Sequence, residues 1–331
     1  FNITVQHQLN DVMSVEVGYV GNRGRHAFVG DGPDVGLNDP TLAGFVDKVP
    51  RDNRKPFFSG QAPTTVGGYG GNFGWTQGIN IFCNCGKNSY DSLQARFNRR
   101  FKDGYSYQMN YTWQKAEQDD GSYFFFDPNL NHGLTGWDRT HTFNLILVYE
   151  LPWGKGKKWG NDWGTLTDAV LGGWQFNGSQ TFQSGTPFDV SYAGASEQRD
   201  VGPNRPNVNG DIKINGGQDQ YFDTTPIGAP NSPYSLPAVG TFGNMKRNSL
   251  RGPGYRRTDA SIFKRFGMGS TRDLEFRIEA VNLFNNVNLG NPDTEIGSPG
   301  NNRPNAGRIN STAYGNADLQ RNFQFAVKFS F

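Results

Sequence analysis

Apolar and aromatic side chains recur at every second position over much of the chain, which is the period of a β-strand whose two faces meet different surroundings. In residues 104–114, five apolar or aromatic residues at odd positions alternate with five polar ones. The C-terminus repeats the pattern, with Leu319, Phe323, Phe325, Val327, Phe329 and Phe331 at odd positions. Further alternating segments occupy residues 1–9, 13–19, 93–101, 143–151, 174–182, 260–262 and 274–280. The pattern predicts about nine strands.

The links between these segments alternate strictly between short and long. The short links are residues 10–11, 102–104, 152–173 and 267–270. The long ones are residues 21–89, 115–139, 193–256 and 286–317, all rich in Gly, Asn, Asp and Pro. Outer-membrane β-barrels show this asymmetry, with tight turns on the periplasmic side and long loops outside. We therefore predict an all-β fold, a transmembrane antiparallel β-barrel, in which nine strands bring Phe331 back to the periplasmic side.

Composition agrees with strands that meet lipid on one face and water on the other. The 331 residues are 35% hydrophobic and 14% aromatic, with 44 Gly, 26 Phe and 13 Tyr. Mean hydropathy is only −0.66, yet so many rings are atypical of disorder. The longest apolar run, residues 145–149, is far shorter than the ~20 residues that a membrane helix requires. A soluble β-sandwich or propeller would have shorter loops.

Other classes of function find little support in the sequence. The formal net charge of +2 offers no basic field for nucleic acid. Cys83 and Cys85 are predicted in a surface loop, as a strained bridge or two free thiols, with pairing to another part of the protein left open. The histidines are too scattered for a metal cluster: His7, His26, His132 and His141. Residues 68–74 lack the context of a phosphate loop, and no Gly-x-Ser-x-Gly is present. We expect no metal, no cofactor and no catalysis.

Charged residues on the polar faces are the candidate site residues. Glu275, Arg277 and Glu279 alternate with apolar residues and are predicted to line the lumen. Arg96 and Arg100 are predicted to do the same. Because buried charge must be paired, we expect these groups to bond to one another or to a plug rather than to substrate.

The terminal strand carries a second candidate feature. Its alternate aromatics resemble the signal that the barrel assembly machinery reads in outer-membrane proteins: Phe325, Val327, Phe329 and Phe331. The same residues would also serve as a lipid-facing girdle.

Ten short motifs, spread over the whole chain, resemble the Oar-like TonB-dependent receptors. They are VGYVGNRG (17–24), YDSLQ (90–94), YTW (111–113), WDRTH (137–141), GGWQ (172–175), QSGTPF (183–188), RPN (205–207), GTFGN (240–244), NSLRGPG (248–254) and EAVNLFN (279–285). The resemblance implies a 22-stranded barrel around a plug, energised through TonB. Residues 1–331 would then be the C-terminal portion of the barrel, with the plug, the TonB box and an N-terminal regulatory-like domain absent from this chain.

Two hypotheses of function follow from the resemblance. The first is an outer-membrane TonB-dependent receptor that takes up or exports a ligand. The second is a surface adhesin or secretion-linked barrel without active transport, and a simple porin ranks third because its loops would be shorter. The partners expected are outer-membrane lipid, the TonB complex through the N-terminal region, the assembly machinery and a ligand that the sequence does not identify.

Overall fold

The computed structural model describes residues 1–29, 38–40, 46–58, 71–79, 83–119, 130, 132–194, 204–268, 272–316 and 320–331. In this part of the chain, nine long strands form one antiparallel sheet, in which each long strand pairs with the next. They are β1 (Asn2–Asn10), β2 (Met13–Val29), β3 (Cys83–Lys102), β4 (Tyr105–Asp119), β6 (His141–Glu150), β7 (Trp174–Gln183), β13 (Tyr255–Gly267), β14 (Asp273–Val281) and β17 (Asn322–Ser330). The short β5 (His132–Leu134) extends the pairing of β4. The prediction of about nine antiparallel strands is confirmed.

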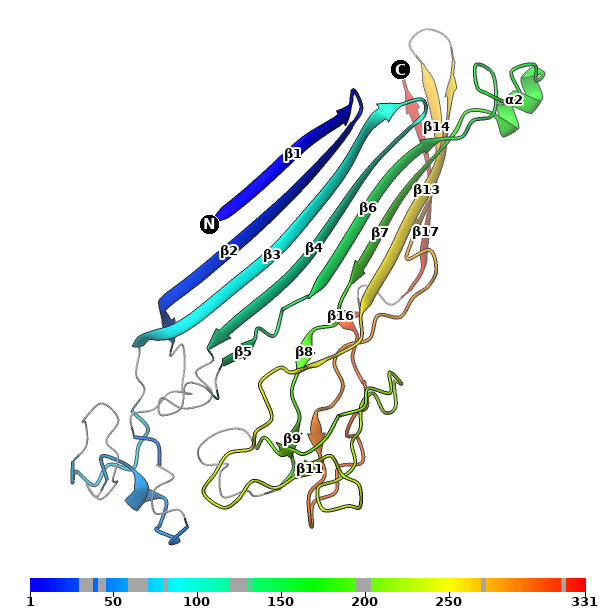
Figure 1. The fold of residues 1–331 in the computed structure, drawn as a ribbon. Helices are drawn as coiled ribbons and strands as arrows, with labels where there is room; N and C mark the ends of the chain where they lie inside the picture. Colours follow the sequence, from blue (N-terminus) through cyan, green and yellow to red (C-terminus); the bar gives the residue numbers. More distant parts are fainter. Residues whose placement is uncertain are drawn as a thin grey trace.

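All the short links lie at one end of the sheet and the long links at the other (Figure 1). The short link between β6 and β7 includes helix α2 (Thr165–Leu171). No helix in the described residues is long and apolar enough to span a membrane. The sheet is open, with β1 and β17 at its two edges.

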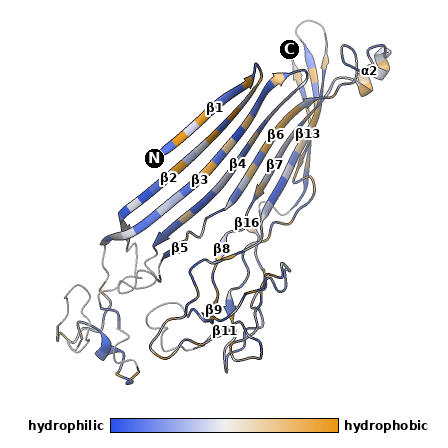
Figure 2. Cartoon of the chain, in the orientation of Figure 1, coloured by the Kyte–Doolittle hydropathy of each residue, from blue (hydrophilic) through white to orange (hydrophobic). Residues whose placement is uncertain are grey.

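The register gives the sheet two chemically distinct faces. Tyr111 of β4 pairs with Phe143 of β6, whereas the preceding Asn110 pairs with Asn144 and with Arg96 of β3. Since paired residues share a face and successive residues alternate, aromatic residues gather on one side and polar residues on the other. The alternation is visible along the strands in Figure 2. We call these the aromatic face and the polar face.

Several strands extend beyond the segments that alternate. β2 and β3 continue through Arg23, which pairs with Ser89, and the predicted link 21–89 is therefore shorter. The backbone of Cys83 and Cys85 lies in β3, so their predicted position in a loop is wrong; their side chains lie outside the described residues. Both faces of a strand that projects into solvent meet water. Backbone pairing then continues without any alternation in hydropathy. At the other end of the chain, Leu319 lies outside the described residues, and β17 begins at Asn322.

The cluster of buried hydrophobic side chains lies beyond the sheet. It is formed by residues of the β7–β13 and β14–β17 links: Phe188, Val190, Tyr192, Tyr221, Phe222, Ile227, Tyr234, Met245, Ile296, Ala306 and Ile309. The sheet exposes many large side chains of its aromatic face, including Tyr111, Trp113 and Phe325. This distribution is opposite to that of a soluble β-sandwich, in which the sheet covers the core.

Candidate functional site: a folded cap beyond the end of the sheet

Two long links of the sheet fold together into one unit, which we call the cap (residues 184–254 and 282–316 where described). Three short strand pairs connect its segments: β8 (Pro187–Phe188) with β12 (Leu250–Arg251), β10 (Asn207–Val208) with β11 (Tyr234–Ser235), and β9 (Ser191–Tyr192) with β15 (Glu295–Ile296). The β9–β15 pair is parallel and joins the two links directly. The sequence analysis predicted these segments only as long links and did not predict that they fold together. Two-residue strands leave no hydropathy period from which they could be predicted.

A buried carboxylate joins the cap to the sheet. Asp138, in the link between β5 and β6, is 0% exposed and accepts a hydrogen bond from the backbone N–H of Ala116 at 2.8 Å. Its other oxygen accepts from the guanidinium of Arg251 in the cap, which also donates to the Asp138 carbonyl at 2.9 Å. Breaking such a pair leaves a buried charge without its partner, which is costly.

Further contacts fix the cap above the end of β4. Arg247 donates to the Gln118 carbonyl at 3.1 Å, and Asn248 donates to the Leu134 carbonyl at 2.6 Å. Between these contacts lies a cleft of about 470 Å³, which is within the range of small-molecule sites. Its lining includes an acidic side chain, Glu117, and two basic ones, Lys246 and Arg247, together with His132. The cleft could therefore hold a polar ligand.

Burial within the cap perturbs one carboxyl group. Asp189 forms an ion pair with Arg205, whose Nε lies 2.6 Å from the carboxylate. Burial nevertheless raises the pKa of the Asp189 carboxyl above its usual value, because desolvation exceeds the attraction of the guanidinium. Burial also raises the pKa of the phenol of Tyr234 in the cap core.

Motifs that are far apart in the sequence meet in the structure. Tyr19 and Arg23, both of VGYVGNRG, bond to Asp91 of YDSLQ, and the Arg23 contact is 2.8 Å long. A Cβ on Gly185 of QSGTPF would lie only 1.8 Å from the carbonyl oxygen of Gly252 in NSLRGPG. Glycine is required where two backbones approach so closely. These motif residues therefore have a structural role: the first set connects β2 to β3, and the second connects two segments of the cap.

A separate aromatic cluster lies in the link between β2 and β3. The rings of Phe57, Phe73 and Trp75 stack with centroids 5.1 to 6.3 Å apart, and the last two are exposed. The buried amide of Asn38 donates to the carbonyls of Trp75 and Gln77, at 2.9 and 2.6 Å. The cluster is therefore held in place while its rings face solvent.

Three of the five predicted lumen residues form one network on the polar face. Glu275 accepts from Arg277 at 2.7 Å and from Arg265 of β13 at 3.0 Å. Arg277 also contacts Glu279 at 3.3 Å. Arg265 was not among the predicted residues, although its pairing opposite Glu275 follows from the register of β13 and β14.

Arg96 and Arg100 lie on β3, and β4, β6 and β7 separate them from that network on β13 and β14. Arg96 shares the polar face with its cross-strand neighbours Glu16 and Asn110. Both arginines are exposed, and among the residues that the structure describes neither forms an ion pair. The five predicted residues therefore do not make one site.

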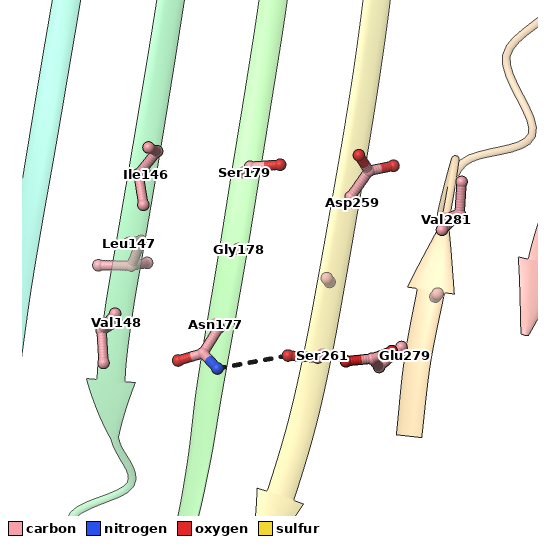
Figure 3. Close-up of a pocket in the computed structure, with 12 residues that line it drawn as sticks. Ile146, Leu147, Val148, Asn177, Gly178, Ser179, Asp259, Ser261, Glu279 and Val281 are labelled. Atoms are coloured by element: carbon pink, nitrogen blue, oxygen red, sulfur yellow. Dashed lines mark hydrogen bonds between the residues drawn. The ribbon is translucent and has the colours of Figure 1, made fainter. Parts of the chain in front are cut away.

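The polar face also has a shallow hollow of about 310 Å³ across β6, β7, β13 and β14 (Figure 3). Asn177 donates to Ser261 across its floor at 3.4 Å, with Glu279 beside it. Ile146 and Val148 line one side, so the hollow presents apolar as well as polar groups.

The four predicted signal residues lie at the end of the sheet. Phe325, Val327, Phe329 and Phe331 are all exposed, and the first three pair with Ile278, Phe276 and Leu274 of β14 on the aromatic face. Within the described residues, no three His, Cys, Asp or Glu side chains are placed to hold a metal ion.

The antiparallel sheet has an aromatic face and a polar face, with short turns at one end and long links at the other. This combination is typical of a membrane-spanning β-barrel protein. A family model described as outer membrane beta barrel domain matches residues 1–324. The chain therefore belongs to the outer membrane β-barrel domain family, and the protein is located in the bacterial outer membrane. Since transmembrane barrel strands turn their apolar side to lipid, we expect the aromatic face to be the lipid-facing one.

Comparisons with solved structures give matches of low identity. The outer membrane transporter YddB from Escherichia coli matches with 9% identity and a TM-score of 0.43, over 100% of this chain and 32% of that chain. FpvAI, in its complex with pyocin S2, matches with 10% identity and a TM-score of 0.41, over 100% and 27%. FpvA of P. aeruginosa bound to heterologous pyoverdines matches with 9% identity and a TM-score of 0.36, over 100% and 32%. The chain thus spans about a third of the length of these structures. No curated protein matches the sequence.

Proposed function

We propose that this chain forms the C-terminal part of the barrel of an Oar-like TonB-dependent receptor, which moves a ligand across the outer membrane. The observation that carries the proposal is an open sheet of nine long strands with paired charges on its polar face. Sheet edges that face lipid are not tolerated within a bilayer, so β1 and β17 require further strands. The 22-stranded barrel that the resemblance implies would enclose a wide lumen. A plug in that lumen would cover the polar face.

Within this proposal, the cap and its 470 Å³ cleft form part of the extracellular ligand entrance. The cap stands at the end of the long links, which is the extracellular side in outer-membrane barrels. The Glu275 network and the hollow beside it would face the plug. No catalytic step, metal or cofactor is part of the proposal.

The test uses the complete gene product in its native membrane. We expect its upstream sequence to encode a plug and a TonB box, and a cysteine placed in that box to cross-link with TonB in living cells. A Pro substitution in the box should abolish the cross-link while the barrel still assembles, as judged by heat-modifiable migration. A complete product that has no plug, or no TonB-dependent cross-link, would refute the transporter proposal.

A surface adhesin is the second candidate, and the aromatic cluster of Phe57, Phe73 and Trp75 favours it. Exposed rings held by a buried polar scaffold are suited to binding a partner. Adhesion of intact cells should then fall with Trp75→Ala and persist without TonB. Adhesion that is unchanged by this substitution would contradict the role, and Phe101→Ala, an exposed aromatic on β3, is a matched control.

A further inference from the structure

The short link between β6 and β7, residues 152–173, carries a cluster of exposed apolar side chains, which we call the foot. Its members are Trp153, Trp159, Leu166, Val170 and Leu171. Leu166 is 84% exposed and Val170 is 64% exposed, one turn apart on α2. Five large apolar side chains exposed on one short link are a candidate interaction surface.

Two side chains show on which side of the sheet the foot lies. Lys264 of β13 pairs with Trp174 of β7 and with Phe276 of β14, so both Lys264 and Trp174 belong to the aromatic face. The Lys264 ammonium donates to the carbonyls of Asp168, at 2.7 Å, and Gly172. The indole N–H of Trp174 donates to the Val170 carbonyl at 2.8 Å. Helix α2 is therefore tied to the lipid-facing side of the sheet rather than to the lumen.

These contacts also explain how a lysine is accommodated on the lipid-facing side. Lys264 is only 5% exposed, and its ammonium lies at the C-terminal carbonyls of α2, where the helix dipole favours a cation. A helix of seven residues would be marginal alone. The Asp168 carboxylate fixes it further by accepting from the backbone N–H of Lys155 at 2.7 Å. Position and orientation of the foot are thus built into the fold.

The charges beside the apolar patch match a phospholipid surface. Lys155 and Lys158 are exposed, and Lys158 lies 4.8 Å from the ring of Trp159. Tryptophan and lysine together are typical of the membrane–water interface, where the indole lies among headgroups and the ammonium reaches anionic lipid. The foot also adjoins the lipid-facing aromatic face, because Trp174 of that face bonds to Val170 of α2.

We propose that the foot lies in the headgroup region of the periplasmic leaflet, with Leu166, Val170 and Leu171 inserted among the acyl chains. Its ligand is the phospholipid bilayer itself. A short helix that presents apolar residues to lipid and lysines to headgroups would act as an interfacial anchor. The inference depends on the outer-membrane location and not on transport or TonB.

The experiment places an environment-sensitive NBD fluorophore on the foot of the complete protein. Single cysteines replace Leu166 or Val170 in a Cys83→Ser, Cys85→Ser background, and the protein is reconstituted in phosphatidylethanolamine–phosphatidylglycerol vesicles. Asp219, whose side chain is 93% exposed in the cap, provides the matched water-facing control as Asp219→Cys. Quenching is measured with a lipid spin-labelled near the headgroup and with aqueous iodide present on both sides of the membrane.

We expect the spin-labelled lipid to quench both foot positions at least about threefold more than the Asp219 position, and iodide to show the reverse order. Quenching by iodide at the level of the Asp219 position, without quenching by lipid, would overturn the proposal. Protection from both quenchers would also overturn it, because protein rather than lipid would then cover the foot. Because Leu166 and Val170 are both exposed and are labelled separately, the second position still tests the proposal if substitution of the first impairs assembly.

Discussion

Removal of the Asp138 carboxylate should release the cap from the sheet. Asp138→Ala leaves the Arg251 guanidinium without its anion and the Ala116 N–H without its acceptor. Breaking a buried ion pair costs roughly 3–5 kcal/mol, but the Arg251 side chain is 29% exposed and water compensates part of that loss. With an unsatisfied N–H adding about 1 kcal/mol, we expect the cap contact to weaken by about 3 kcal/mol.

Such a loss predicts a change in protease sensitivity. Since 1.4 kcal/mol is a factor of ten, the population with a detached cap should rise about 100-fold. Limited proteolysis of intact cells measures that population when opening is fast relative to cleavage. Cleavage within residues 184–254 should accelerate by a similar factor, while heat-modifiable migration of the barrel stays unchanged.

A double-mutant cycle provides the control. Because the two groups act on each other, Arg251→Met should add little to Asp138→Ala, whereas independent effects would add. Asp138→Asn, which keeps an acceptor for Ala116, should be milder than Asp138→Ala. Cleavage of the Asp138→Ala cap within about twofold of the native rate would refute the reasoning.

Three further predictions concern the two faces and the cap. Tyr111→Asp places a charge on the lipid-facing side, which should destabilise the folded barrel by less than ~2–4 kcal/mol and lower the folded yield. Asn110→Asp, on the polar face, should have only a mild effect. Equal heat-modifiability of the two variants would contradict the face assignment. Glu275→Ala removes the shared acceptor of two arginines that are partly exposed, so we expect a loss of only about 1 kcal/mol in urea unfolding, and Glu275→Gln should recover part of it. Asp189 has a raised pKa in the folded state, so its carboxyl group binds a proton more readily in the folded cap than in the unfolded chain. The resulting contribution to the stability of the cap is therefore fully present below the ordinary Asp pKa and is lost as pH rises through the raised pKa. Asp189→Asn should flatten the pH profile of cap proteolysis, and an unchanged profile would show that this carboxyl does not contribute.

The site was only partly predictable from the sequence. The place of Glu275, Arg277 and Glu279 on one face follows from alternation, and Arg265 could have been added from a hairpin register. No comparable pattern predicts the Asp138–Arg251 pair, although both residues lie in motifs that resemble those of the Oar-like receptors. The backbone position of Cys83 was missed because β3 continues where hydropathy no longer alternates.

Alternation and link lengths along the chain were enough to predict about nine strands, the separation of short and long links and the two faces of the alternating segments. These are local properties, because successive residues of a membrane-spanning strand face lipid and the lumen in turn. Hydropathy along the strand therefore alternates with a period of two. Three features became evident only from the folded chain: two long links share a common core, Asp138 meets Arg251 across 113 positions, and α2 lies on the side of the aromatic face. Contacts of that kind depend on the curvature of the sheet and on packing between distant segments, and neither leaves a period along the chain.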